Sequence, residues 1–413
     1  MPDPRRWKAL ALLCTAFFMV ILDSAIVVVA LPSIDADLAF GAGDLQWVLS
    51  AYLLSFGGLL LLGGRVADLV GRRRMFIAGT ALFALASLGA GLAGATGTLL
   101  AARVAQGVAA AIMTPTALSI VMTTFPEGAE RNKALGIWGS TGAIGGTAAW
   151  LIGGPVTSGL GWQWIFFLNV PVAAAVAALS PVLLRESRRR AGPRRFDAAG
   201  AVTITAALVA LVYAVVDAPQ TGWGDARTLG LLALAAVLIA IFAGIESRSS
   251  APLAPLRVFR SRSLVGGNLV LFALGTTAFG VPFILTQYAQ DVLGWSPVHF
   301  GLASVVMPVS AVAGTFTAQA VATRGGVRAV AVAGLASGLN NAAFQIGGAV
   351  GTAILSTVAV SAAHGAVPAA ALTQGCRSAF TAAIAVAALG VLAASLLLGR
   401  PRRPEPVPLS AAA

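Results

Sequence analysis

Two charged side chains lie inside long apolar stretches of this sequence. Asp23 lies in the apolar run 8–32, and Arg103 lies near the start of the run 99–122. A carboxylate deep in a membrane costs roughly 2.5 kcal/mol or more, so such residues usually face a water-filled cavity or a partner. Burial disfavours the charged form of a carboxyl group, which makes proton uptake near neutral pH possible. We therefore interpret Asp23 as a proton-binding group.

Arg103 needs a counter-charge or a wet cavity, because arginine stays protonated in proteins. An ion pair with Asp23 would meet this need, and protonation or ligand binding would then break it. Gln106 lies on the same helical face as Arg103, three residues further on. Two plainer alternatives stay open. Asp23 could cap a local polar contact, and Arg103 could extend to the membrane surface.

The elements that carry these residues are predicted to be membrane-spanning helices. The chain is 58% hydrophobic and 10% charged, with a mean hydropathy of +0.88, whereas a soluble domain is about half apolar and about a quarter charged. A spanning helix needs about 20 apolar residues. Twelve runs come near that length: 8–32, 45–63, 75–95, 99–122, 134–156, 162–184, 198–216, 228–245, 264–285, 298–322, 329–360 and 378–399.

The net charge of +12 sets the expected orientation in the membrane. All but three of the 27 Lys and Arg residues lie in the two tails or in loops on one side of the predicted spans, the exceptions being Arg103, Arg227 and Arg377. The positive-inside rule then places both termini in the cytoplasm. It explains the charge without nucleic-acid binding. We expect a multi-pass protein of a bacterial inner (plasma) membrane, whose first run is a retained span and not a cleaved signal.

A short basic stretch separates the second and third runs. It contains Gly64, Asp68, Gly71, Arg72 and Arg73. Asp68 could pair with an arginine of this stretch or accept hydrogen bonds from a helix N-terminus. Either contact would act as a conformational latch, because a two-state protein needs a contact that can break. Glycine permits turn dihedrals that other residues avoid. The alternative is that these charges only set topology.

Polar and small residues mark further candidate positions. The fifth run is rich in glycine, including Gly145, Gly153 and Gly154, which favours either close helix packing or a deformable helix. The polar residues proposed for a substrate path in the second half are Asn268, Gln287, Asn341 and Gln345. The sequence has no phosphate-binding loop and no His–Cys cluster. We therefore expect no enzyme activity, no cofactor and no metal site.

The chain resembles drug:proton antiporters of the major facilitator superfamily, from the branch with fourteen helices. The resemblance rests on residues 22–32, on Gln46–Trp47 and residues 52–54, on the basic stretch, and on Arg103, Gln106, Gly107 and Pro115. It implies that Asp23 and Arg103 serve proton coupling and that the basic stretch is the latch. We add Trp47, Tyr52 and Gln106 to the substrate path.

Two departures from that family pattern affect the predicted architecture. Ala149 and Trp150 stand where the helix 5 signature carries Gly-Pro. Residues 323–328 resemble the loop after the family's tenth helix, and residues 334–341 resemble the start of its thirteenth helix. Two helices of the family pattern are therefore missing between these two segments. Hydropathy alone gives six plus six helices. The motifs favour an all-α membrane protein with about 12 spans arranged as six plus two plus four, which lacks two helices of the second bundle.

This arrangement divides the chain into six parts. We expect a six-helix bundle in 1–184, a cytoplasmic linker in 185–197, an extra helix pair in 198–246, a cytoplasmic loop in 247–262, a shortened second bundle in 263–399 and a disordered tail in 400–413. The expected function is proton-coupled efflux of amphipathic small molecules by a monomer in the lipid bilayer. The alternatives are a ligand sensor or degenerate transporter that does not transport, and an uncoupled or solute-importing facilitator.

Overall fold

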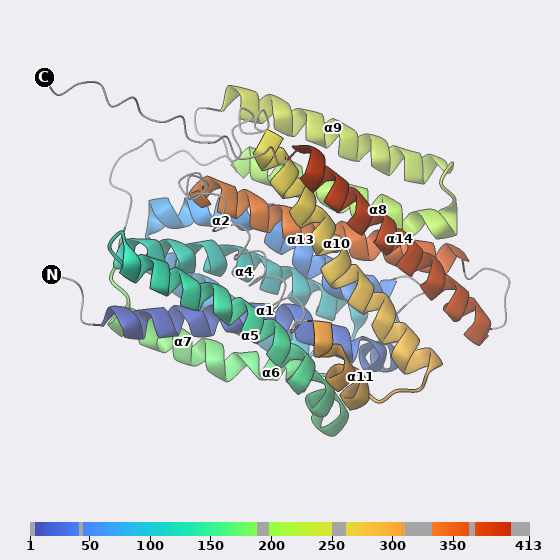
Figure 1. Cartoon of the computed structure of the whole chain (residues 1–413), viewed down its shortest axis with the longest axis horizontal. Helices are drawn as coiled ribbons and strands as arrows, with labels where there is room; N and C mark the ends of the chain where they lie inside the picture. Colours follow the sequence, from blue (N-terminus) through green and yellow to red (C-terminus); the bar gives the residue numbers. More distant parts are fainter. Residues whose placement is uncertain are drawn as a thin grey trace, which may run out of the picture.

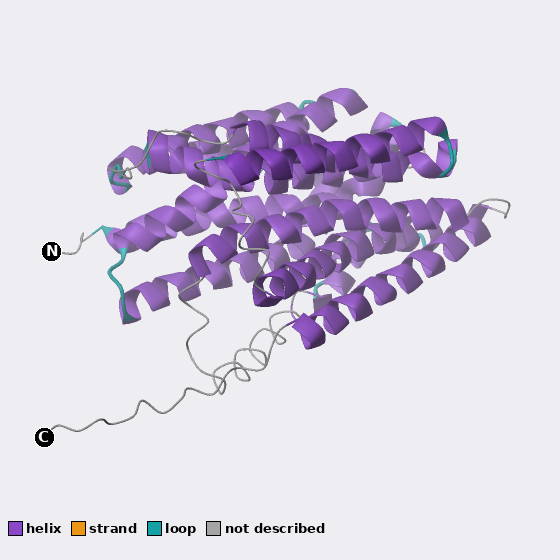
Figure 2. Cartoon of the chain, turned by 90° about the horizontal axis from the view of Figure 1, so that it is seen from above, coloured by secondary structure: helices purple, strands orange, loops and turns teal. Residues whose placement is uncertain are grey.

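The computed structural model describes residues 5–40, 44–187, 198–249, 262–307, 309, 333–362 and 368–397. Within these ranges the chain is helical, and no strand occurs (Figure 2). Figure 1 shows the long helices lying side by side along one direction. Nine helices of the described part are long and apolar enough to cross a membrane. The predicted all-α polytopic fold is confirmed.

The first bundle contains seven helical segments. They are α1 (Arg6–Leu38), α2 (Trp47–Val70) after a 3-10 turn (Asp44–Gln46), α3 (Arg72–Gly91), α4 (Thr96–Thr124), α5 (Ala129–Leu160), α6 (Trp164–Phe167) and α7 (Asn169–Leu183). Helix α4 packs against both α2 and α3, while α1 packs against α5 and α7. These contacts place α1, α2, α4 and α7 around a shared interior.

The predicted run 162–184 contains α6 and α7 as one candidate span, Trp164–Leu183, because Leu168 between them keeps helical dihedrals (φ −57°, ψ −30°). One prediction for this bundle needs correction. Gly64 lies inside α2 and not in a turn, since α2 continues to Val70. Only Gly71 separates α2 from α3, with φ 127°. Charged residues are compatible with a helix that emerges from the membrane, so the apolar run understated the length of α2.

Helices α8 (Ala198–Thr221) and α9 (Ala226–Arg248) form a hairpin at the edge of the molecule (Figure 1). Helix α8 packs against α2 and α13 (Ala333–Ala362). The Thr357 hydroxyl donates to the Val215 carbonyl at 2.9 Å across the α8–α13 contact. Helix α9 exposes apolar side chains such as Leu234, Val237 and Ile241, which suits a surface facing lipid. The hairpin is therefore peripheral.

The remaining helices form a second group. It contains α10 (Arg262–Gln287), a π-helical turn (Tyr288–Val292), α11 (Pro297–Ser304), α13 and α14 (Pro368–Leu397). Helix α10 packs against α13 and α14. The run 329–360 forms one helix, α13, over its described residues from 333 on. Most of the run 298–322 and of the predicted linker, second cytoplasmic loop and tail lies outside the described residues.

Candidate functional site

Asp23 and Arg103 form a buried ion pair at the centre of the first bundle. The Arg103 Nη1 atom donates to Asp23 Oδ2 at 2.7 Å. Both side chains are 0% exposed, so Arg103 does not extend to the membrane surface. The expected pairing is present. Breaking a buried ion pair by removing one partner costs about 3–5 kcal/mol, because the other charge stays buried without compensation.

Two amide side chains complete the hydrogen bonding of the Asp23 carboxylate. Gln106 Nε2 donates to Asp23 Oδ1 at 3.0 Å, and Asn169 Nδ2 donates to the same oxygen at 2.8 Å. Gln106 also accepts from Arg103 Nη1 at 2.9 Å and donates to the Ser87 hydroxyl at 2.9 Å. Asp23, Arg103, Gln106, Asn169 and Ser87 thus form one buried polar cluster, which we call the Asp23 cluster.

Helix α2 supports the arginine from the other side. Arg103 Nε donates to the Val48 carbonyl at 2.9 Å, and the guanidinium lies over the Tyr52 ring at 4.4 Å from its centroid. The Phe166 ring lies at 5.8 Å. Among the described residues, the second terminal nitrogen, Nη2, has no hydrogen-bond partner. One donor of a buried charge is therefore available to a water molecule or a ligand.

A close contact between α2 and α4 makes this arrangement possible. Gly107 follows Gln106 on α4, and a Cβ atom there would lie 2.5 Å from the Tyr52 carbonyl oxygen. Glycine is required at this position because any side chain would push α2 away from α4. Since Arg103 bonds to Val48 and packs on Tyr52, such a shift would also disturb the ion pair.

Sequence reasoning missed Asn169 and Ser87. Neither residue carries a charge, and nothing in the linear sequence shows that α3 and α7 pack around Asp23. The one available signal was the amide of Asn169 within an otherwise apolar run. Serine gave no signal, because its hydroxyl commonly bonds within its own helix.

The substrate-path candidates of the first bundle occupy different surroundings. Gln106 and Tyr52 belong to the Asp23 cluster or pack directly on it. Tyr52 is 0% exposed, and its hydroxyl donates to the Val20 carbonyl at 3.3 Å. Trp47 lies at the start of α2, where its ring is 6.1 Å from that of Tyr213 on α8. The structure does not bring Trp47 to the cluster.

The candidates of the second group are spread along two helices. Asn268 Nδ2 donates to the Leu264 carbonyl of its own helix at 2.8 Å. Gln287 is half-buried at the end of α10, and Asn341 is half-buried on α13. Gln345 is buried against Gly57 of α2, where the two helix groups meet. These four residues form no common cluster, and a shared role in a substrate path stays a prediction.

The latch residues make contacts within the first bundle. Arg72 Nη2 lies 2.8 Å from Asp68 Oδ1, so Asp68 pairs with an arginine of the same stretch. The backbone N–H of Arg73 donates to Glu186 Oε1 at 3.1 Å. A Cβ atom on Gly71 would lie 2.8 Å from that same oxygen. Glu186, which the sequence did not single out, thus ties the α2–α3 connection to the end of α7.

The glycines of α5 lie at two interfaces. Cβ atoms on Gly145 and Gly153 would contact Ile21 and Ile26 of α1 at 3.3 Å and 3.0 Å, while one on Gly154 would lie 2.6 Å from the Pro297 carbonyl oxygen of α11. The contacts at these three glycines fit close helix packing, one of the two interpretations offered by the sequence.

Besides the contact of α2 with α13, the two helix groups touch at the end where α1 finishes and α2 begins. The rings of Trp150 on α5 and Phe300 on α11 meet edge to face at 5.7 Å. Gln290 Nε2 of the π-helical turn donates to the Val29 carbonyl of α1 at 3.0 Å. Together with the Gly154–Pro297 contact, these contacts close that end of the molecule between the two groups.

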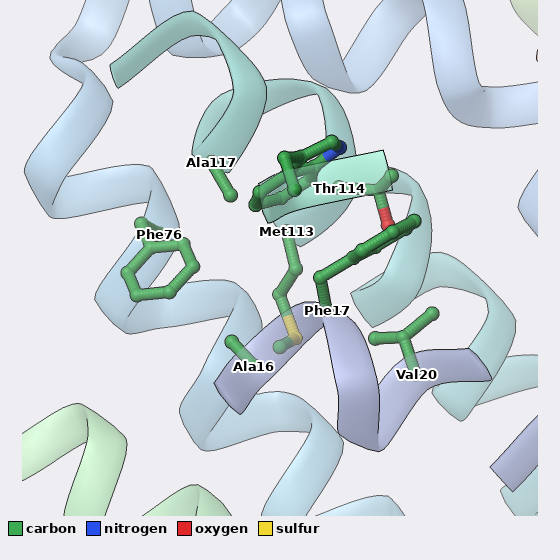
Figure 3. Close-up of a pocket in the computed structure, with 8 residues that line it drawn as sticks. Ala16, Phe17, Val20, Phe76, Met113, Thr114 and Ala117 are labelled. Atoms are coloured by element: carbon green, nitrogen blue, oxygen red, sulfur yellow. The ribbon is translucent and has the colours of Figure 1, made fainter. Parts of the chain in front are cut away.

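A small apolar hollow lies between α1, α3, α4 and α5 (Figure 3). It has no room for a water molecule, whereas typical ligand sites enclose roughly 300–1,000 Å³. Its lining is Ala16, Phe17, Val20, Phe76, Met113, Thr114, Ala117 and Trp138. The described residues contain no group of three or more His, Cys, Asp or Glu side chains that could hold a metal ion.

Residues 13–336 match the family described as the Major Facilitator Superfamily. The chain belongs to the major facilitator superfamily. It is 43% identical over 302 residues to a puromycin resistance protein of Streptomyces alboniger, covering 73% of this chain and 60% of that protein. It is 41% identical over 299 residues to a cephamycin export protein of Amycolatopsis lactamdurans, covering 72% and 62%. A tetracenomycin C resistance and export protein of Streptomyces glaucescens is 39% identical over 298 residues, covering 72% and 55%.

This chain of the major facilitator superfamily thus spans about 60% of the length of these relatives. The relatives are resistance and export proteins and not enzymes, in agreement with our expectation for the chain's class. Together with the nine candidate spans found among the described residues, the family shows a multi-pass membrane protein.

Solved structures of the superfamily agree with the fold. A peptide transporter in complex with sulfate has a TM-score of 0.60 at 15% identity, covering 95% of this chain and 96% of that one. A bacterial homologue of the human lysosomal transporter Spinster has a TM-score of 0.51 at 19% identity, covering 97% and 81%. At these identities the likeness concerns the fold alone.

Proposed function

We propose that this protein exports amphipathic small molecules in exchange for protons. The observation that carries the proposal is the Asp23–Arg103 ion pair, which is 0% exposed and joined by side chains from four helices. When a buried carboxylate that is paired with a permanent cation takes up a proton, the cation loses its counter-charge, so the surrounding contacts must change. Such a group can couple proton binding to a conformational change.

The proposed cycle alternates between two arrangements of the bundles. With Asp23 ionised, the pair holds α1 against α4. A proton on Asp23 removes the counter-charge of Arg103, which then requires a new partner or water. The cluster rearranges in response, and α1 and α4 shift with it. A ligand shifts an equilibrium between two states only if it binds one state more tightly than the other. The proton is such a ligand if Asp23 has a different proton affinity in each state.

The substrate class follows from the relatives. Their names concern puromycin, tetracenomycin C and cephamycin. We extend to this chain only their common character as small organic molecules with polar and apolar parts. Export sites for such molecules are apolar and adaptable, so no single compound is assigned.

The proposed setting is a bacterial inner membrane, with both termini in the cytoplasm and a monomeric protein. The closed end, where Trp150 meets Phe300, then faces outwards.

We keep the Asp68–Arg72 and Arg73–Glu186 contacts as the proposed cytoplasmic latch. Helix α9 packs chiefly on α8 and exposes apolar side chains, which supports our interpretation of α8 and α9 as the extra pair of the six plus two plus four arrangement.

The test is efflux from a pump-deficient bacterium. Cells expressing the protein, or its Asp23→Asn variant, are loaded with puromycin, tetracenomycin C and ethidium, with and without a protonophore. The proposal predicts wild-type efflux that the protonophore and the substitution both abolish. Efflux by Asp23→Asn at the wild-type rate would favour an uncoupled or solute-importing carrier.

A second candidate is a membrane protein that binds ligands without transporting them. The departure from the family pattern at residues 323–341, where two helices of the pattern are missing, motivates this alternative. A shortened second group could bind a ligand against the first bundle and yet fail to cycle. Binding of puromycin by the purified protein, without flux in proteoliposomes that hold well-folded wild type, would support it.

A further inference from the structure

We propose that Asn169 is a positioning residue that sets how readily Asp23 takes up a proton. The inference rests on the proposed proton coupling at Asp23. Its structural basis is a single contact: Asn169 Nδ2 donates to Asp23 Oδ1 at 2.8 Å, from a helix that carries neither partner of the ion pair. The side chain is 2% exposed.

The amide of Asn169 acts on the ionised carboxylate. Asp23 Oδ1 accepts from Gln106 and Asn169, while Oδ2 accepts from Arg103. Each donor stabilises the negative charge in a place that solvent does not reach. A hydrogen bond to a charged group is stronger than one between neutral groups. Removing one donor therefore favours the protonated form and moves proton uptake to higher pH.

Asn169 is the donor to the carboxylate whose helix carries neither member of the ion pair. Gln106 is tied to Arg103 through its own oxygen and lies on the same helix. Asn169 is the first residue of α7, and Leu168 before it keeps helical dihedrals (φ −57°, ψ −30°), so α6 and α7 continue one another. The α6 part of this segment places Phe166 beside the guanidinium of Arg103. A movement of the α6–α7 segment would thus reach both members of the pair.

Few other groups can titrate in this neighbourhood. Arg103 of α4 and Tyr52 of α2 are the titratable side chains that interact with Asp23 in the described part of the chain. Helix α3 contributes the neutral Ser87, and α7 contributes the neutral Asn169. No charged side chain of α5, α6, α10 or α11 among the described residues interacts with the Asp23 carboxylate. A shift in an Asn169 variant can therefore be attributed to the lost amide.

The experiment measures protonation of Asp23 directly. Full-length protein in lipid nanodiscs is titrated by difference infrared spectroscopy, with Asp23→Asn used to assign the carboxyl band. Asn169→Leu removes the donor at similar size, and its midpoint is expected to rise by about one pH unit, which is about tenfold in proton affinity. The pH profile of puromycin efflux should move in the same direction. Gln163→Leu is the matched control, since its amide donates to the carboxylate of Asp37 at 3.2 Å, in an exposed place.

Each outcome decides something. A folded Asn169→Leu variant with the wild-type midpoint overturns the role of Asn169 and leaves the proposed function intact. A wild type whose Asp23 does not titrate anywhere in the pH range of the folded protein overturns the proposed function, and this inference with it. If Asn169→Leu does not fold, the isosteric Asn169→Asp variant decides. A second carboxyl group beside Asp23 must move the first proton uptake to higher pH, and an unshifted midpoint contradicts the proposal.

Discussion

The guanidinium of Arg103 reaches across from α4 to Asp23 on α1, 2.7 Å from Nη1 to Oδ2, and no part of either side chain is exposed. The two residues are 80 positions apart in the sequence, so the pair connects α1 to α4 and also neutralises the buried charge of Arg103. Its isolation from solvent makes its energetic and functional effects measurable.

Asp23 and Arg103 should stabilise the folded protein because each neutralises the buried charge of the other. Asp23→Asn is expected to lower the free energy of unfolding by about 3 kcal/mol, because Arg103 stays charged and buried. Adding Arg103→Gln should cost much less than the sum of the two single changes. Denaturant unfolding of the purified variants measures this. Asp68→Asn is the control. Its pair with Arg72 is partly exposed, at 27% and 13%, and should contribute less than about 1 kcal/mol. Strictly additive effects at Asp23 and Arg103 would contradict the compensation.

The approach of α2 to α4 should depend on Gly107. Gly107→Ala places a methyl group against the Tyr52 carbonyl and is expected to cost about 1–3 kcal/mol in the free energy of unfolding. The same substitution at Gly97, on the same helix with nothing within 4 Å, should be neutral or stabilising. Equal stability of the two variants would show that the helices do not approach as closely as the structure indicates.

The turn at Gly71 should be sensitive for two reasons that can be separated. Gly71 and Gly128 have nearly equal φ values, 127° and 124°, which L-residues rarely adopt. Alanine at either site should cost about 1–3 kcal/mol from backbone strain. At Gly71 the new methyl group also meets the Glu186 carboxylate, whereas nothing lies within 4 Å at Gly128. Thermal unfolding should therefore show the larger loss for Gly71→Ala. A larger loss at Gly128 would contradict the Glu186 contact.

Closure between α5 and α11 should require Gly154. Gly154→Val is expected to push α11 away from α5 and reduce efflux. Spin labels at the exposed residues Leu151 and Leu302, in a variant without the two native cysteines, measure the separation by double electron–electron resonance. The mean distance should increase in Gly154→Val and stay unchanged in Gly146→Val, whose site is open. An unchanged distance in both would mean that this contact does not close the molecule.

The sequence predicted the centre of the site better than its surroundings. A charge in an apolar run needs a partner, and only two such charges occur deep in the first half, so Asp23 with Arg103 followed from elementary electrostatics. Helical spacing added Gln106. Asn169 and Ser87 are neutral, and which helix packs against α1 depends on tertiary structure that residue types do not encode locally.

Helix boundaries show the same limit. The apolar run that ended at residue 63 described the part of α2 suited to lipid, whereas the helix itself continues to Val70 because its backbone bonds do not depend on hydropathy. Tyr52 was assigned to a substrate path by resemblance, and that role stays a prediction, whereas its packing on Arg103 is visible only in the structure.

The central claim is that protons move through Asp23 in exchange for substrate. The direct measurement uses proteoliposomes that hold the full chain and a pH-sensitive dye, with a puromycin gradient as the only driving force. The account predicts proton movement opposite to puromycin in the wild type and none in Asp23→Asn of equal reconstitution. Puromycin flux without proton movement in the wild type, or undiminished proton movement in Asp23→Asn, would contradict it.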